Sequence, residues 1–92
     1  MIINRNEVGE LIEIYTKAYC PYCWKAKDLL EKKNQRYTEI DVEHDDGKHK
    51  EMIKRSGKMT VPQIFINGIH IGGCDDLYSM EEKGELTKIL KS

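Results

Sequence analysis

The sequence has no marked excess of charge of either sign and no long run of apolar residues. Its 92 residues include 15 basic and 16 acidic side chains, so the formal net charge is −1. This balance argues against a general attraction to nucleic acid or to anionic membranes. No apolar run approaches the roughly 18–20 residues that span a bilayer. Residues 1–7 also lack the apolar stretch of a secretory signal. We therefore expect a cytoplasmic protein without a membrane segment.

Cysteine is scarce as well, and its number is odd. The chain has three cysteines, so at least one of them has no partner within the chain. A framework of structural disulfides is not expected in a reducing compartment. Cys20 and Cys23 are close enough in sequence to pair, which leaves Cys74 over. This arrangement favours a redox pair.

A zinc site is the alternative for two cysteines with two residues between them. Tetrahedral zinc usually needs four protein ligands. Beyond the pair, the chain offers only Cys74 and three histidines. His44 and His49 have a spacing that could bind a metal, but the charged stretch 43–51 that holds them is typical of a solvated surface. We expect no metal.

Short periodic runs predict one small α/β domain over residues 10–92, preceded by a polar extension at residues 1–9. The run at 10–16 alternates in polarity as strands do, and a helical pattern joins it to a second such run. Two strands joined in this way should be parallel, with a right-handed crossover. The expected strands are 10–16, 36–42, 63–66 and 69–71, and the expected helices are 22–33, a weak one ending near 55, and one from 74 onward.

Turn signals complete the order β-α-β-α-β-β-α. Asn67-Gly68 is a strong hairpin signal between two short apolar runs. Gly84 marks a possible kink or break in the last helix. We therefore predict a four-stranded mixed sheet flanked by three helices, a thioredoxin-like fold of minimum size.

Cys20-Pro21-Tyr22-Cys23 lies where the first strand pattern changes to a helix pattern. Cys20 would then lie at the head of a helix, where free N–H groups and the helix dipole favour an anion such as a thiolate. Pro21 suits the first helical turn because its missing N–H would have no partner there. We expect Cys20 to be the exposed, attacking cysteine. Cys23, one turn deeper, would resolve the mixed disulfide.

Three segments of the chain together resemble dithiol glutaredoxins. They are residues 17–23, 60–66 and 72–77. The whole sequence is most similar in type to the small bacterial members of that family. The resemblance covers residues 10–91. It implies a glutathione-dependent thiol–disulfide oxidoreductase that reduces protein disulfides and glutathione mixed disulfides.

The resemblance also implies a glutathione site, which begins in the segment before the third strand. Pro62 resembles the family's cis-proline, which faces the cysteine motif. Val61 would pair its N–H and C=O with the backbone of glutathione, much as a strand adds to a sheet edge. Thr60 would add a side-chain hydroxyl.

The remaining ligand contacts implied by the resemblance involve the two carboxylates of glutathione. Gly73 and Cys74 would present backbone N–H groups to the γ-glutamyl carboxylate. Asp75 would accept from the α-ammonium group. Lys17 would pair with the glycine carboxylate, although a solvated loop lysine is the alternative. Tyr22 would pack against the same end of the ligand.

Purely structural explanations exist for several of these residues. Asp75 could act only as a helix N-cap. Val61-Pro62 could be an ordinary turn, and Gly72-Gly73 only a tight bend. All three explanations together would require the residues to face one cleft by coincidence, so we favour the ligand site.

Trp24 and Cys74 lie close to the proposed site without an assigned role. Trp24 could flank a partner surface, but we expect a partly buried core aromatic. Cys74 could be an oxidation site. We expect it to be unreactive, because reactivity requires more than a thiol.

Two other functions remain as alternatives. One is a thioredoxin-like electron donor to ribonucleotide reductase, recharged by a flavin-dependent reductase. The other is a carrier of a [2Fe–2S] cluster, held in a dimer through the attacking cysteine and glutathione. Our main expectation is a monomer that uses glutathione as co-substrate. Its other partners would be glutathionylated or disulfide-containing proteins, including ribonucleotide reductase.

Overall fold

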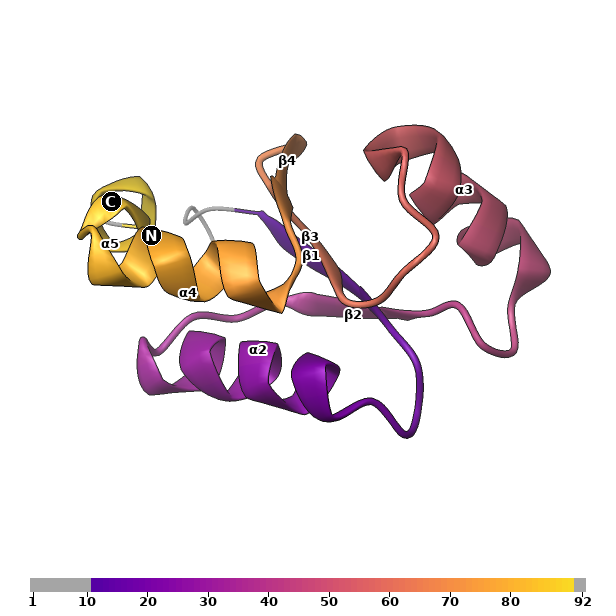
Figure 1. The fold of residues 1–92 in the computed structure, drawn as a ribbon, viewed down its shortest axis with the longest axis horizontal. Coiled ribbons are helices and arrows are strands. Elements are labelled where there is room, and N and C mark those ends of the chain that lie inside the picture. Colours follow the sequence, from indigo (N-terminus) through magenta and orange to yellow (C-terminus); the bar gives the residue numbers. More distant parts are fainter. Residues whose placement is uncertain (1–10, 91–92) are drawn as a thin grey trace, which may run out of the picture.

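The computed structural model describes residues 11–90, so the predicted extension at residues 1–9 lies outside the described residues. The described chain forms four strands and four helices, which Figure 1 shows around one sheet. In chain order they are β1 (Ile12–Thr16), α2 (Pro21–Lys32), β2 (Thr38–Asp41), α3 (Asp46–Ser56), β3 (Gln63–Ile66), β4 (Ile69–Gly72), α4 (Cys74–Glu82) and α5 (Glu85–Leu90). None of the helices in this range is long and apolar enough to cross a membrane.

The sheet is mixed and has the strand order β2-β1-β3-β4. β1 pairs in parallel with β2, and the helix α2 connects the two strands. β3 runs antiparallel to both β1 and β4. The expected parallel pair and hairpin therefore merge into one sheet, and the predicted fold class is confirmed.

The two faces of the sheet are covered by different helices. Ile12, Ile14, Ile64 and Ile66 pack with apolar side chains of α2, α4 and α5. On the opposite face, Tyr15 and Phe65 pack with Val42 and with Met52 of α3. Figure 1 accordingly shows α3 on one side of the strands and the other three helices on the other side. Side chains of neighbouring strand residues alternate between these faces, as the sequence pattern predicts.

Local signals in the sequence explain where the elements begin and end. Asp45 caps α3 by accepting a hydrogen bond from the Lys48 N–H at 3.0 Å. Asn67 and Gly68 adopt positive φ values of 54° and 81° and form the two-residue hairpin turn. With its cap at Asp45, α3 starts at Asp46 and ends at Ser56, close to the predicted end near residue 55.

The expected third helix is two helices. α4 ends at Glu82 and α5 begins at Glu85, with Gly84 between them at a φ of 76°. The left-handed conformation of Gly84 ends the first helix and turns the chain, so the possible break in the sequence is a real one. The sheet is thus flanked by four helices, where three were expected.

Candidate active site

Cys20 lies at the N-terminus of α2, between the end of β1 and the first helical turn. It is the N-cap residue, and Pro21 follows at the first helical position. Its Sγ accepts a hydrogen bond from the Cys23 N–H at 3.2 Å. This N–H group is one of those that an α-helix leaves without a backbone partner at its start. The sulfur is half-buried, so an attacking position at the surface is available to it.

Cys23 occupies a different environment one turn along the same helix. Its side chain is fully buried. Burial is the main cause that raises the pKa of the Cys23 thiol to about 12, and the neighbouring Cys20 adds to the effect. Cys23 is therefore a thiol at neutral pH. The two cysteines differ in exposure as the sequence predicts.

The segment before β3 runs alongside the attacking sulfur. The Val61–Pro62 peptide bond is cis, as the resemblance implies. Cys20 Sγ lies 3.9 Å from the Val61 carbonyl oxygen and donates toward it. Pro62 is buried, whereas Thr60 is exposed and Val61 is half-buried. The main chain on either side of Val61 is thus next to the cysteine.

The start of α4 forms the opposite wall of the site. Gly73 is the N-cap of α4, and its N–H donates to Asp76 Oδ2 at 2.9 Å. Gly72 has a φ of 124°, and a Cβ there would lie 2.3 Å from the same oxygen. Asp76, and not Asp75, therefore satisfies the helix start, which contradicts the explanation of Asp75 as only an N-cap. Asp75 remains exposed.

One cleft connects these segments. Seven of the eight residues predicted to bind glutathione line it, namely Tyr22, Thr60, Val61, Pro62, Gly73, Cys74 and Asp75. The exception is Lys17, which lies in a neighbouring hollow with Thr16, Ala18, Lys27, Glu39, Asp41 and His44. The exposed side chain of Lys17 would have to reach across to contact a ligand in the cleft.

Sequence reasoning missed several residues of the same cleft. Lys58, Gln63, His70, Ile71, Gly72 and Asp76 also line it. Lys58 is the only lysine or arginine among these lining residues. The position of Lys58 two residues before Thr60 was the available signal, since a residue next to a predicted binding segment shares its surroundings.

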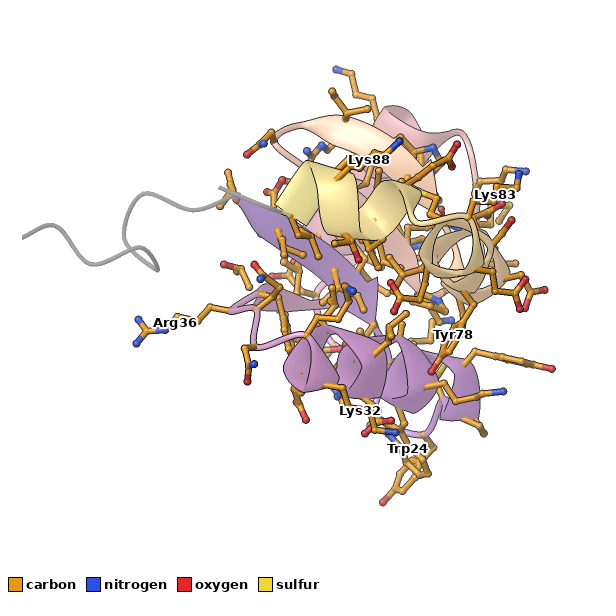
Figure 2. All side chains as sticks on the ribbon, turned by 90° about the vertical axis from the view of Figure 1, so that its left-hand side faces the viewer. Trp24, Lys32, Arg36, Tyr78, Lys83 and Lys88 are labelled. Carbon is orange, nitrogen blue, oxygen red and sulfur yellow. The ribbon has the colours of Figure 1, made fainter. Side chains whose placement is uncertain are left out.

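The burial of Cys74 agrees with its expected low reactivity, whereas the exposure of Trp24 does not agree with its expected burial. Cys74 is buried at the cleft wall, and burial raises the pKa of its thiol. Trp24 is 52% exposed, so the expectation of a partly buried core aromatic is wrong. Figure 2 shows Trp24 at the outer side of α2, whereas Tyr78 of α4 turns toward that helix and donates to the Lys25 carbonyl at 3.1 Å.

Metal-binding geometry is not evident among residues 11–90. No group of three or more His, Cys, Asp or Glu side chains in this range could hold a metal ion. His44 instead lies against Asp41, with 2.9 Å between Nδ1 and Oδ2. The expectation of no metal stays a prediction.

The chain is similar to known proteins in both sequence and structure. The family model described as Glutaredoxin matches residues 12–71. Glutaredoxin 3 of Escherichia coli K12 is 54% identical over 80 residues, which cover 87% of this chain and 96% of the relative.

Two solved structures are similar as well. A buckwheat glutaredoxin–glutathione complex aligns with a TM-score of 0.81 and 32% identity, over 88% of this chain and 76% of the other. A structure described as "Metal Binding of Glutaredoxins" aligns with a TM-score of 0.70 and 45% identity, over 91% of each chain. Together with the dithiol at the head of α2, these similarities show that the chain belongs to the glutaredoxin family of thiol–disulfide oxidoreductases.

Proposed function

We propose that this protein is a glutathione-dependent oxidoreductase that reduces glutathione mixed disulfides and protein disulfides through Cys20 and Cys23. The observation that carries the proposal is the position of Cys20. Its sulfur lies 3.9 Å from the carbonyl of Val61, which lines the cleft beside it. A disulfide attacked by Cys20 therefore has its neighbouring atoms at the main chain of Val61.

The cleft suits a small peptide with two carboxylates. The Val61 main chain offers a place for strand-like pairing with a peptide backbone. The first turn of α4 offers N–H groups to a carboxylate, and the exposed Asp75 offers an acceptor to an ammonium group. Since the Gly73 N–H already serves Asp76, the N–H groups of Cys74 and Asp75 are the better donors.

The second carboxylate of glutathione requires a cation at the other end of the cleft. Lys58 lines the cleft, whereas Lys17 lies in the adjacent hollow. We propose that Lys58 takes this role, alone or together with Lys17. Tyr22, which is 58% exposed at the cleft wall, would pack against the same end of the ligand.

The reaction on a glutathione mixed disulfide needs Cys20 alone. The Cys20 thiolate attacks the glutathionyl sulfur, so a Cys20–glutathione disulfide forms and the target protein leaves as a thiolate. The thiolate of a second glutathione then attacks the bound glutathionyl sulfur. This step releases oxidised glutathione and restores the Cys20 thiolate.

The reaction on a protein disulfide also needs Cys23. Cys20 attacks one sulfur of the target, and a mixed disulfide forms. Cys23 then loses its proton and attacks Cys20 Sγ, which releases the reduced target and leaves a Cys20–Cys23 disulfide. Two glutathione molecules reduce this disulfide and become one molecule of oxidised glutathione. Because the Cys23 thiol is buried, it does not compete with Cys20 for the first attack on the target disulfide.

Two single substitutions test these roles in a glutathione-coupled assay. Cys20→Ser should abolish turnover of both a glutathionylated peptide and a protein disulfide. Cys23→Ser should preserve turnover of the peptide and abolish that of the protein disulfide. The assignment is wrong if Cys23→Ser loses activity on the glutathionylated peptide.

The choice of reductant separates this proposal from a thioredoxin-like donor. Wild-type protein should turn over with glutathione and not with thioredoxin reductase, because the cleft fits a tripeptide. Efficient recharging by thioredoxin reductase alone would favour the donor function. We further propose that the protein acts as a monomer in the cytoplasm, on disulfide-containing proteins such as ribonucleotide reductase.

A [2Fe–2S] carrier is the second candidate, and the similarity to a glutaredoxin structure concerned with metal binding favours testing it. Anaerobic reconstitution followed by visible absorption and size-exclusion chromatography is the measurement. We expect no stable cluster, because Pro21 stiffens the first turn of α2 between the cysteines. A cluster-bridged dimer would overturn the monomer proposal.

A further inference from the structure

A chain of hydrogen bonds joins His70 on β4 to Thr60 through Gln63. His70 Nε2 lies 2.7 Å from Gln63 Oε1. Gln63 Nε2 donates to the Thr60 carbonyl oxygen at 3.0 Å and to Thr60 Oγ1 at 3.2 Å. Gln63 is only 3% exposed, so water cannot readily replace a partner that its amide loses.

The donor and the acceptor of each hydrogen bond between His70, Gln63 and Thr60 follow from the chemistry of the groups. The Thr60 carbonyl can only accept, so the NH2 group of Gln63 must face it. The oxygen of the Gln63 amide consequently faces His70. Because that oxygen can also only accept, His70 Nε2 must carry a proton and donate it. All the polar atoms of the Gln63 amide are then used.

His70 is itself held firmly by the sheet. Its ring lies 4.9 Å from the ring of Phe65, at 35° to it, and the two residues are register partners on β4 and β3. The Arg55 guanidinium lies 4.0 Å from the Phe65 ring centre. His70 therefore has a fixed place from which to orient the amide.

We propose that His70 is a positioning residue for glutathione binding, which acts through Gln63 to hold Thr60 and the adjoining Val61 main chain at the cleft. This inference rests on the proposed function, because the Val61 main chain is the proposed partner of glutathione. Thr60, Val61, Gln63 and His70 all line the cleft. Loss of the His70 donor would leave Gln63 Oε1 buried without a partner. The amide would then turn away and release Thr60.

Two substitutions at His70 separate the hydrogen bond from the packing. His70→Phe keeps an aromatic ring against Phe65 and removes the donor. His70→Gln restores an N–H donor. We expect His70→Phe to raise the KM for a glutathionylated peptide about three- to tenfold, the usual range for one buried hydrogen bond. His70→Gln should recover most of this loss. His49→Phe is the matched control, since His49 lies on α3 and lines neither the cleft nor the hollow that holds Lys17.

A second measurement excludes a general structural defect. Cys23 is fully buried, so iodoacetamide labels it only when the fold opens. Labelling of Cys23 in the reduced protein should therefore stay as low in His70→Phe as in the wild type. In a Gln63→Leu background, His70→Phe should have no further effect on the KM, because the connecting amide is gone.

Several outcomes would overturn the proposal. They are an unchanged KM in His70→Phe, increased labelling of Cys23 in that variant, an additive effect in the Gln63→Leu background, or no recovery in His70→Gln. If wild-type protein does not turn over the glutathionylated peptide at all, the proposed function itself fails. Failure of the positioning role alone would leave wild-type turnover intact.

Discussion

At the scale of single residues, the molecule gives three cysteines three environments. Cys20 is half-buried at a helix start, Cys23 is fully buried in the same helix, and Cys74 is buried at the cleft wall. Burial raises the pKa of both Cys23 and Cys74. Only a thiolate attacks a disulfide or an alkylating agent, so the differences in environment translate into differences in reactivity.

Alkylation of the reduced protein should therefore be selective for Cys20. With a pKa of about 12, Cys23 is a thiolate in about one molecule in 10,000 at pH 8, since each pH unit below the pKa lowers the fraction tenfold. Alkylation of Cys23 should therefore rise about tenfold with each pH unit and become appreciable only as the pH approaches 12. Iodoacetamide labelling between pH 7 and 9, read by peptide mass spectrometry, is the measurement.

The unfolded protein in denaturant is the control for this selectivity, because all three thiols should then react at similar rates. Comparable labelling of Cys20 and Cys23 in the folded protein would contradict the assigned environments.

Helical periodicity explains one residue that the sequence analysis placed wrongly. The buried residues of α2 are Cys23, Ala26, Leu29 and Leu30, which form one stripe along the helix. Trp24 comes directly after Cys23 and thus lies about 100° around the helix from it. The positions of the apolar residues along the helix therefore predict that Trp24 is exposed. The aromatic character of Trp24 suggested burial that its position in the helix does not allow.

At the scale of elements, the junction between β4 and α4 is the most demanding part of the chain. Gly72 ends the strand at a φ of 124°, and Gly73 caps the helix with its N–H bonded to Asp76. The strand, the turn and the helix start are thereby packed into a few residues. The first turn of α4 is brought to the cleft in this way.

Gly72→Ala should destabilise this junction. Its Cβ would lie 2.3 Å from Asp76 Oδ2, in a backbone conformation that L-residues rarely adopt. We expect a loss of about 2–4 kcal/mol of unfolding free energy, from backbone strain together with displacement of Asp76. Urea unfolding followed by circular dichroism measures it.

Gly84→Ala is the matched control for this prediction. Gly84 also has a positive φ, of 76°, but nothing lies within 4 Å of a Cβ there. Its loss should be about 1 kcal/mol, the cost of the backbone conformation alone. Equal losses at the two glycines would show that the contact with Asp76 does not matter.

The sequence predicted the order and type of the elements because their signals are local. Alternating polarity, the Asn67-Gly68 turn and the glycines at helix ends act over a few residues. Contacts between elements are not encoded in this way. The hydrogen bonds from His70 through Gln63 to Thr60 require the β3–β4 register, and the separation of Lys17 from the cleft requires the path of the loop after β1.

At the scale of the whole molecule, both faces of the sheet combine apolar packing with a charged contact to a helix. Under α2, α4 and α5 an apolar cluster is joined by the Lys27–Glu39 ion pair between α2 and β2, at 2.9 Å. The face under α3 has a charged contact as well. There, Arg55 donates to Glu13 Oε1 at 3.0 Å and to the Tyr15 hydroxyl at 2.7 Å, with its guanidinium 4.0 Å from the Phe65 ring centre. Arg55 thus attaches α3 to two central strands.

Arg55→Lys should weaken that attachment although it keeps the charge. Arg55 makes two hydrogen bonds to the Glu13 carboxylate, at 3.0 and 3.3 Å. A lysine cannot make such a pair and also lie flat on an aromatic ring. We expect a loss of about 1–2 kcal/mol of unfolding free energy in urea. Arg36→Lys is the control, because Figure 2 shows Arg36 extending away from the fold and its side chain is exposed. Equally small losses in both variants would rule out this role for Arg55.

The contact between Cys20 and Val61 joins residues 41 positions apart in the chain. The site therefore forms only when the segment with the cysteines and the segment with the cis-proline come together in the folded protein. Without tertiary structure, the Cys23 thiol regains an ordinary pKa and both sulfurs become equivalent to any small dithiol. The difference in reactivity between the Cys20 and Cys23 sulfurs is therefore a property of the folded state. The ratio of their alkylation rates measures the fraction of molecules that are native.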